Sequence, residues 1–312
     1  MPFYTGSASS FSDLRTALFN ACVAEGWTLS TDVLTKGSAA VKIENNTTSV
    51  TIKDLGLVLQ GGTSATGATL VNPSPVTPRM GRASTATIQP TFPMEYYIHI
   101  FDSPDEVYLV AKSNVDYYYW LSFGLSDVPG LSSTGLWLSA NANPRVGPGS
   151  SPGYAIGVSS GGINQYSGGF FWEDGQSAAS SAQNQNTIAS GLDSVIWSSD
   201  TASSGANSKF GINGLAASTL LSVQPNAWNS ESTLVRAQVF QWRDANKCSM
   251  VADIKNARYV RIDNYSPEQI ITLGSDQWRV YPYYRKNLSA RDGGTGIEHT
   301  GTFGFAIRYD GP

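Results

Sequence analysis

Charged, ionisable and reactive side chains are scarce in this chain of 312 residues. Asp, Glu, Lys and Arg make up 14% of it, and it contains two histidines and two cysteines. Neither His99 nor His299 has a second His or Cys at ligand spacing, which argues against a zinc site. The net charge of −4 argues against a nucleic-acid partner, which would require a basic face. No apolar run approaches the ~20 residues of a membrane span, so none is expected.

Signatures of catalysis are also missing. No Gly-x-Ser-x-Gly elbow precedes a helix, and no phosphate-binding glycine loop is present. Two pairs of carboxylates are adjacent in sequence, Asp105 with Glu106 and Glu173 with Asp174. Because neighbours in a strand point to opposite faces, neither pair converges as the two acids of a glycosidase must. We therefore expect no catalytic residue, no metal and no cofactor, and we predict that the chain is not an enzyme.

The two cysteines, Cys22 and Cys248, lie far apart in the sequence. We expect both to be free, buried and structural, as in a protein made in a reducing cytoplasm. The first ten residues have no basic region followed by an apolar stretch, so we expect no secretory signal.

What is abundant favours β-structure. Aromatic residues make up 11% of the chain, and Gly, Ser, Thr and Asn are frequent, a mixture that suits strands joined by ordered polar loops. The stretch from Met94 to Phe123 predicts a three-stranded antiparallel meander with turns at 102–105 and 113–114. Both faces of its first strand are apolar or aromatic, so we expect this strand to be covered on both sides, with His99 as a core or interface histidine.

The N-terminal third predicts a small α+β unit over residues 1–70. An extended arm over residues 1–9 precedes a helix from about Ser12 to Glu25, whose apolar face contains Leu14 and Leu18. Short hairpins follow. The unit is marginal in size, so we expect it to lean on the main body or on a neighbouring subunit. Residues 71–93 contain five prolines and predict an extended connection that cannot supply a central strand.

Residues 94–312 predict the main body. The meander and several later strands are enough for a two-layer antiparallel β-sandwich, interrupted by a Gly/Ser/Asn-rich loop region at about 140–210. That region is either a long surface loop or an interaction arm. The predicted fold is therefore mainly β: an antiparallel β-sandwich body with a small N-terminal α+β unit carrying one helix.

Two aromatic clusters are the strongest candidates for a contact surface. Tyr117, Tyr119 and Trp120 form one candidate aromatic surface, for which a doubly covered core, a subunit interface and a sugar-stacking platform all remain open. The second cluster surrounds Pro282, which cannot donate to a ladder and so indicates a sheet edge or a bulge. Its members form a candidate subunit interface: Tyr281, Tyr283, Tyr284, Arg285 and Lys286.

Several stretches resemble structural proteins of tailed bacteriophages. Val280 to Pro312 (VYPYYRKNLSARDGGTGIEHTGTFGFAIRYDGP) is similar to the end of such proteins, and Phe92 to Ala140 resembles them as well. The N-terminal helix followed by Gly26-Trp27-Thr28-Leu29 fits the same group. The likeness covers most of the chain apart from the Gly/Ser/Asn-rich middle, and it is one of texture and short motifs.

The resemblance implies a virion protein of the tail, baseplate or neck without enzymatic activity. It would be made in the host bacterial cytoplasm, would assemble as a homo-oligomeric ring and would contact other tail proteins. The alternative is a tail-borne carbohydrate- or receptor-binding module that uses the Tyr and Trp clusters on a host-surface glycan. A polysaccharide-degrading enzyme is disfavoured by the lack of a convergent acid pair.

Overall fold

The structure is a computed structural model that describes residues 2–47, 55–82, 89–143, 156–159, 162–165, 170–171, 186–199, 212–214, 224–226, 228–243, 247–291 and 299–311. Within them the protein is mainly β, with several antiparallel sheets and one α-helix near the N-terminus, as predicted. Most of the Gly/Ser/Asn-rich region at 140–210, including Glu173 and Asp174, lies outside the described residues.

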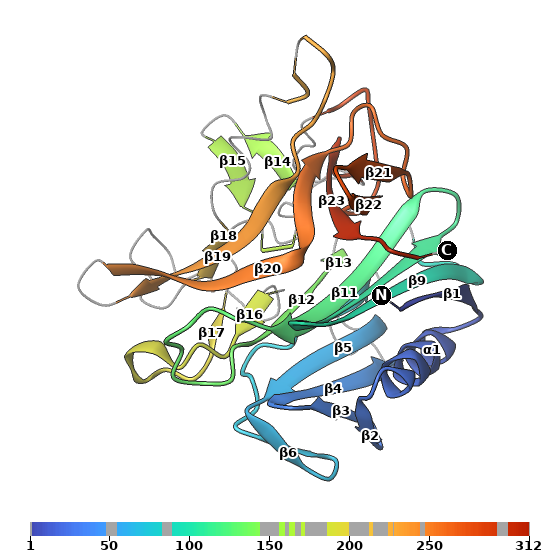
Figure 1. Cartoon of the computed structure of the whole chain (residues 1–312). Coiled ribbons are helices and arrows are strands. Elements are labelled where there is room, and N and C mark those ends of the chain that lie inside the picture. The colour runs from blue at the N-terminus through green and yellow to red at the C-terminus, as the bar shows by residue number, and fades with distance from the viewer. Residues whose placement is uncertain are drawn as a thin grey trace.

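A seven-stranded sheet, here called the central sheet, is the middle of the molecule (Figure 1). Its strands, in spatial order, are β1 (Phe3–Ala8), β9 (Met94–Asp102), β10 (Asp105–Ser113), β11 (Tyr117–Leu125), β12 (Leu136–Ala140), β16 (Asn186–Ile188) and β17 (Ser198–Ser199). The predicted meander forms β9 to β11, and the N-terminal arm joins it as β1, with Phe3 opposite His99.

Alternation along β9 to β12 gives the central sheet two apolar faces. Ile98, Leu109 and Leu121 point into a first core, whereas Tyr108 and Trp120 point into a second. The expectation that the first strand of the meander is covered on both sides is therefore confirmed. His99 is fully buried, which makes it a core histidine.

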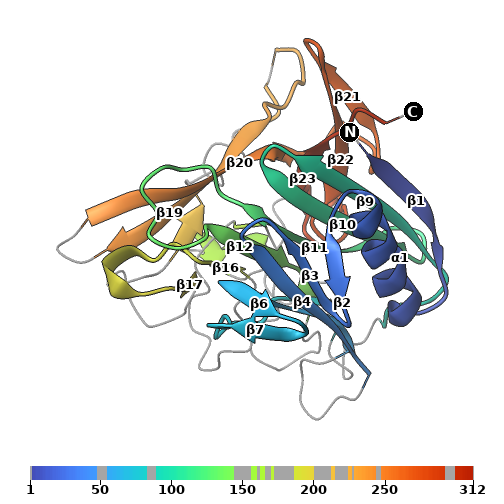
Figure 2. The same cartoon turned by 60° about the horizontal axis from the view of Figure 1, so that its bottom comes forward.

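The helix and a six-stranded sheet cover the first face. This helix-side sheet has the order β13 (Ala142–Asn143), β8 (Arg79–Arg82), β5 (Leu55–Gly62), β4 (Ala39–Asn46), β3 (Val33–Lys36) and β2 (Thr28–Ser30). Helix α1 (Phe11–Ala24) begins after Ser10, whose side chain accepts a hydrogen bond from the Asp13 amide at 3.1 Å. Leu14, Leu18 and Cys22 of its inner face are buried in the first core, and Figure 2 shows α1 beside β1 and β9.

The connection at 71–93 differs from its prediction. β8 lies between β13 and β5, so part of this segment is an interior strand. The reason is local: β8 occupies a proline-free stretch between Pro78 and Pro90, where every backbone amide can donate. A short hairpin of β6 (Ser64–Thr66) and β7 (Thr69–Val71) precedes it.

A second six-stranded sheet covers the other face. This C-terminal sheet has the order β18 (Ile212–Gly214), β19 (Val235–Arg243), β20 (Lys247–Arg261), β23 (Phe303–Arg308), β22 (Asp276–Pro282) and β21 (Ile270–Leu273). A hairpin of β14 (Ile156–Ser159) and β15 (Gly162–Gln165), and the short 3-10 helix η1 (Leu192–Ser194), complete the regular elements. The described fold thus has three layers, with the central sheet shared by two cores (Figure 1).

Candidate functional site

The first aromatic cluster is core, not surface. Tyr117 is 8% exposed, while Tyr119 and Trp120 are each 1% exposed. The Tyr117 and Tyr119 rings pack on Tyr284 at centroid distances of 5.3 and 5.7 Å. Trp120 points to the opposite face, where its indole N–H donates to the carbonyl of Tyr283 at 2.9 Å. The expected aromatic surface is therefore corrected to two buried faces, because both sides of β11 are covered.

The tyrosines of the second cluster are also internal. Tyr281 and Tyr283 are fully buried and Tyr284 is 5% exposed. β22 is paired with β21 and with β23, where Pro282 lies opposite Gly304. Beyond Pro282 the chain turns onto the central sheet, and the Tyr284 carbonyl accepts the Tyr118 amide at 2.7 Å. These tyrosines join two sheets of one chain, so the expected tyrosine edge is not on the surface.

The two cations of that cluster bind groups of the same chain. The Arg285 guanidinium lies 2.8 Å from the Asp116 carboxylate and stacks on the Tyr117 ring at 4.8 Å. The hydrogen bond to Asp116 raises the pKa of Arg285. Lys286 donates to the carbonyls of Asp263 and Tyr265 at 2.8 and 2.7 Å, and burial lowers its pKa. Both side chains keep some exposure, but their nearest partners are intramolecular.

A buried carboxylate, Glu106, joins the central sheet to the C-terminal sheet. The β19–β20 register shifts after Arg236, leaving residues 255–257 of β20 as a bulge without partners on β19. Glu106, which is fully buried, accepts the amides of Lys255 and Asn256 at 3.0 and 3.1 Å, the Asn256 side-chain amide at 3.0 Å and the Tyr108 hydroxyl at 2.8 Å. Burial raises the pKa of Glu106, and these four hydrogen bonds oppose the rise. All four donors are part of the fold, so the hydrogen bonds of the Glu106 carboxylate connect the two sheets.

A second acid, Glu268, lies at the rim of the same interface. Its carboxylate accepts the hydroxyls of Tyr97 and Tyr118 at 2.6 and 2.8 Å, and it lies 2.9 Å from the Lys112 ammonium. Burial tends to raise its pKa, but these bonds outweigh burial and lower it. Nearby, the Arg279 guanidinium lies 4.4 Å from the centroid of the Tyr97 ring. This cluster stabilises the packing of two sheets and holds no unpaired nucleophile.

Sequence reasoning did not find either acid. For Glu106 one signal was available, because a charged residue inside a strand covered on both faces must be buried and therefore needs several donors. For Glu268 no local signal exists, since Tyr97, Lys112 and Tyr118 are more than 140 residues away in sequence.

Two further expectations concern thiols and metals. Cys22 is free and buried, as predicted, and burial raises the pKa of its thiol. Cys248 is free but exposed, which corrects the expectation that both are buried. Cys248 lies at the start of β20, opposite Trp242 near the end of β19. Among the described residues, no group of three His, Cys, Asp or Glu side chains is placed to hold a metal ion.

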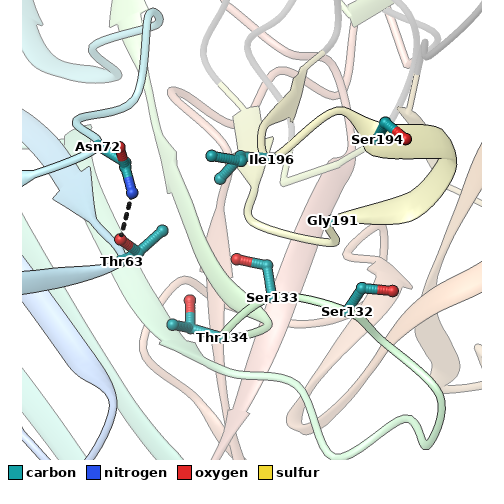
Figure 3. A pocket seen from close by; sticks show the side chains of 8 residues that line it. All are labelled: Thr63, Asn72, Ser132, Ser133, Thr134, Gly191, Ser194 and Ile196. Atoms are coloured by element: carbon teal, nitrogen blue, oxygen red, sulfur yellow. Dashed lines mark hydrogen bonds between the residues drawn. The ribbon is translucent and has the colours of Figure 1, made fainter.

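One concave site among the described residues is a hollow of about 510 Å³ (Figure 3). Three segments far apart in sequence form its walls: the start and end of the β6–β7 hairpin, the loop between β11 and β12, and the loop between β16 and β17. The lining residues are Thr63, Asn72, Ser132, Ser133, Thr134, Gly191, Ser194 and Ile196. This site was not predicted, because isolated Ser and Thr residues carry no local signal.

The hollow is neutral and rich in hydroxyl groups. None of its eight lining residues is charged, and Ile196 is the apolar side chain among them. The Asn72 side-chain amide donates to the Thr63 hydroxyl at 3.2 Å, a contact drawn in Figure 3. A serine attacks a substrate only when a base activates it, and no His, Asp or Glu lines this hollow. Its chemistry is suited to binding through hydrogen bonds.

No family model matches the chain, and no curated protein matches it significantly. Among the described residues, no helix is long and apolar enough to span a membrane.

Proposed function

We propose that this protein is a non-enzymatic structural component of a bacteriophage tail, in the baseplate or a tail-associated ring, that assembles through protein–protein contacts. The stretches that resemble tail proteins supply the framework of the fold. Phe92 to Ala140 contains β9 to β12 of the central sheet, and Val280 to Pro312 contains β23 and the end of β22. The resemblance therefore concerns the architecture that holds the layers together.

The observation that carries the proposal is one side chain, Trp228, which is 96% exposed. It lies in the loop before β19, which projects at the top of the molecule in Figure 1. Trp is among the residues most enriched at the centres of protein interfaces and is rarely left in water. A fully exposed indole in an otherwise well-packed chain is best explained by a partner that covers it.

The loop that carries Trp228 is internally braced. The Trp228 amide donates to the Asn226 side chain at 2.8 Å, and the Ser230 amide donates to the Asn226 carbonyl at 2.9 Å. Asn226 in turn donates its amide to the Glu231 carbonyl at 2.8 Å, and the Asn264 side chain donates to the Ser230 carbonyl at 2.6 Å. A braced loop loses little conformational freedom on binding, which favours its use as an anchor.

Immunogold electron microscopy tests the tail assignment directly. Antibodies raised against the purified chain should label the tails of intact particles of the phage that encodes it. Purified virions that lack the protein, or label confined to the head, would rule the assignment out.

Complementation tests the role of Trp228. A phage deprived of this protein is supplied with Trp228→Ala, and we expect a folded, soluble protein whose incorporation into particles is reduced. Val115→Ala is the matched control, since Val115 is also apolar and 84% exposed but lies in the β10–β11 turn. If Trp228→Ala is incorporated as well as the control, this loop is not an assembly contact.

The second candidate function is a tail-borne carbohydrate- or receptor-binding module. The Tyr and Trp clusters that first prompted it are buried, so they do not support it. The observation that favours it is the hydroxyl-lined hollow.

A further inference from the structure

We propose that the hollow between the β6–β7 hairpin, the β11–β12 loop and the β16–β17 loop is a binding site for a neutral carbohydrate. The proposal gives the second candidate function a site and a ligand class, and it does not depend on a place in the tail. It moves the expected sugar contact from the buried aromatic rings to a neutral polar cavity.

The walls of the hollow are closely fitted to one another. Gly191 has a positive φ of 68°, and a Cβ atom placed on it would lie 2.6 Å from the Ser133 amide nitrogen. Only glycine allows the β16–β17 loop to approach the β11–β12 loop this closely. The Ser132 amide donates to the Ser190 carbonyl at 3.0 Å, which ties the two loops together.

Trp197 ties the third wall, the β6–β7 hairpin, to the β16–β17 loop. Its indole N–H donates to the Asn72 carbonyl at 2.8 Å, and its ring is 8% exposed. The backbone of Asn72, whose side chain lies beside Thr63 in the hollow (Figure 3), is therefore held by a partly buried hydrogen bond from the β16–β17 loop. Segments more than 100 residues apart in sequence thus form one preorganised cavity.

A charged residue next to the lining residues, Asp193, is paired with Arg243. Asp193 lies between two lining residues of the β16–β17 loop, but its carboxylate forms a two-point ion pair with the Arg243 guanidinium at 2.9 and 2.5 Å. This pair fixes the loop where Asp193 and Ser194 have positive φ values of 53° and 65°. The hollow itself is left without a charged lining residue.

The lining selects the chemistry of the ligand. An anion would need a cationic side chain, and a metal ion would need carboxylates, but neither is present among the lining residues. A wholly apolar ligand would leave the hydroxyls of Ser132, Ser133 and Ser194 without partners. A sugar ring presents many hydroxyls that both donate and accept, as Ser and Thr hydroxyls do.

One apolar side chain complements this set. Ile196 is 39% exposed and points into the space between the loops, opposite Ser133 and Thr134 (Figure 3). A pyranose has apolar C–H groups as well as hydroxyls, and Ile196 offers them an apolar contact. Because no acidic pair lines the hollow, the bound sugar would be held without being cleaved.

Saturation-transfer NMR on the full chain tests the proposal. Glucose, galactose and N-acetylglucosamine are the neutral probes, and glucuronic acid is the charged comparison. We expect saturable transfer to at least one neutral sugar and weaker binding of glucuronic acid. Absence of saturable transfer to every neutral probe, or binding of glucuronic acid as tight as that of glucose, would overturn the proposal.

Variants locate the binding within the chain. Ser132→Ala with Ser133→Ala removes two hydroxyls with little change in volume and should weaken binding on the order of tenfold. Ser132→Tyr should block the hollow, and Ser275→Tyr in the exposed β21–β22 turn is the matched control. Urea unfolding checks that each variant is folded. If the folded hollow variants bind as the control does, the sugar binds elsewhere and the assignment is wrong.

The two proposals fail separately. Sugar binding is measured on the isolated chain, so its absence would leave the tail assignment in place. Failure of tail labelling would leave the sugar site in place.

Discussion

Acidification should destabilise this protein through one residue, His99. Its ring is fully buried between the central and C-terminal sheets, against Phe3 at a centroid distance of 4.9 Å and beside Tyr281, whose hydroxyl lies 3.0 Å from Nε2. Burial and the nearby Arg279 guanidinium lower the pKa of His99 to about 3, from an ordinary value of 6.5.

The size of the effect follows from the two pKa values. Between pH 6.5 and about 3 the unfolded chain binds a proton at His99 that the folded chain does not, so the free energy of unfolding falls as pH falls. At pH 5 the difference is about 1.5 pH units at 1.36 kcal/mol per unit, or about 2 kcal/mol relative to pH 7.5. This loss is a large share of the stability of an ordinary domain.

The measurement is urea unfolding followed by tryptophan fluorescence at pH 7.5 and at pH 5. The variant His99→Gln keeps an amide for the Tyr281 hydroxyl but cannot titrate, so its loss between the two pH values should be about 2 kcal/mol smaller than that of the wild type. Comparing the two proteins cancels the contributions of the carboxylates, including Glu106 and Glu268. Equal losses in both proteins would show that His99 does not set the acid sensitivity.

Three more predictions follow from particular side chains. Native protein should react with one equivalent of a thiol reagent, through exposed Cys248. A second equivalent should react only after denaturation exposes Cys22, and no reductant should be needed. Reaction of two equivalents in the native state would contradict the burial of Cys22. Glu106→Ala leaves four donors unpaired and should lower the free energy of unfolding by ~3–5 kcal/mol. Glu106→Gln keeps an acceptor and should cost less. If urea unfolding gives the reverse order, Glu106 is not held as an acceptor. Tyr284→Ala removes a buried ring that packs on Tyr117 and Tyr119 and should cost ~3–5 kcal/mol, so an unchanged urea midpoint would place this ring outside the core.

Local patterns predicted the meander and the helix but not the layers that cover them. The alternation from Met94 to Phe123 predicted three strands and the coverage of both faces of the first one, because a strand apolar on both faces has no other stable environment. The spacing of Leu14 and Leu18 after a Ser cap predicted α1 to within one residue at each end. Both predictions depend on residues close in sequence, whose periodicity reflects the element itself.

The same alternation was ambiguous at the aromatic clusters. For Tyr117, Tyr119 and Trp120 a core, an interface and a sugar platform all stayed open, since a large ring fits any surface that excludes water. What decides between them is the layer beyond the strand. The segment directly after β22 supplies Tyr283 and Tyr284 from more than 160 residues later in the chain, and no local pattern reports that contact.

The residues that make a site differ in kind from the residues that make this fold. Aromatic and branched side chains stand out in the sequence because burial requires them, and here both cores use them. The hollow is made of Ser, Thr, Asn and one Ile from three loops, each residue ordinary in its own segment. The sequence position that the hollow does constrain is Gly191, where the close approach of the Ser133 amide excludes a Cβ atom. A lone glycine in a polar loop, however, predicts only a turn. A neutral hollow on a mainly β framework is therefore recognised only after the layers have placed its loops, as are the distant partners of Glu268.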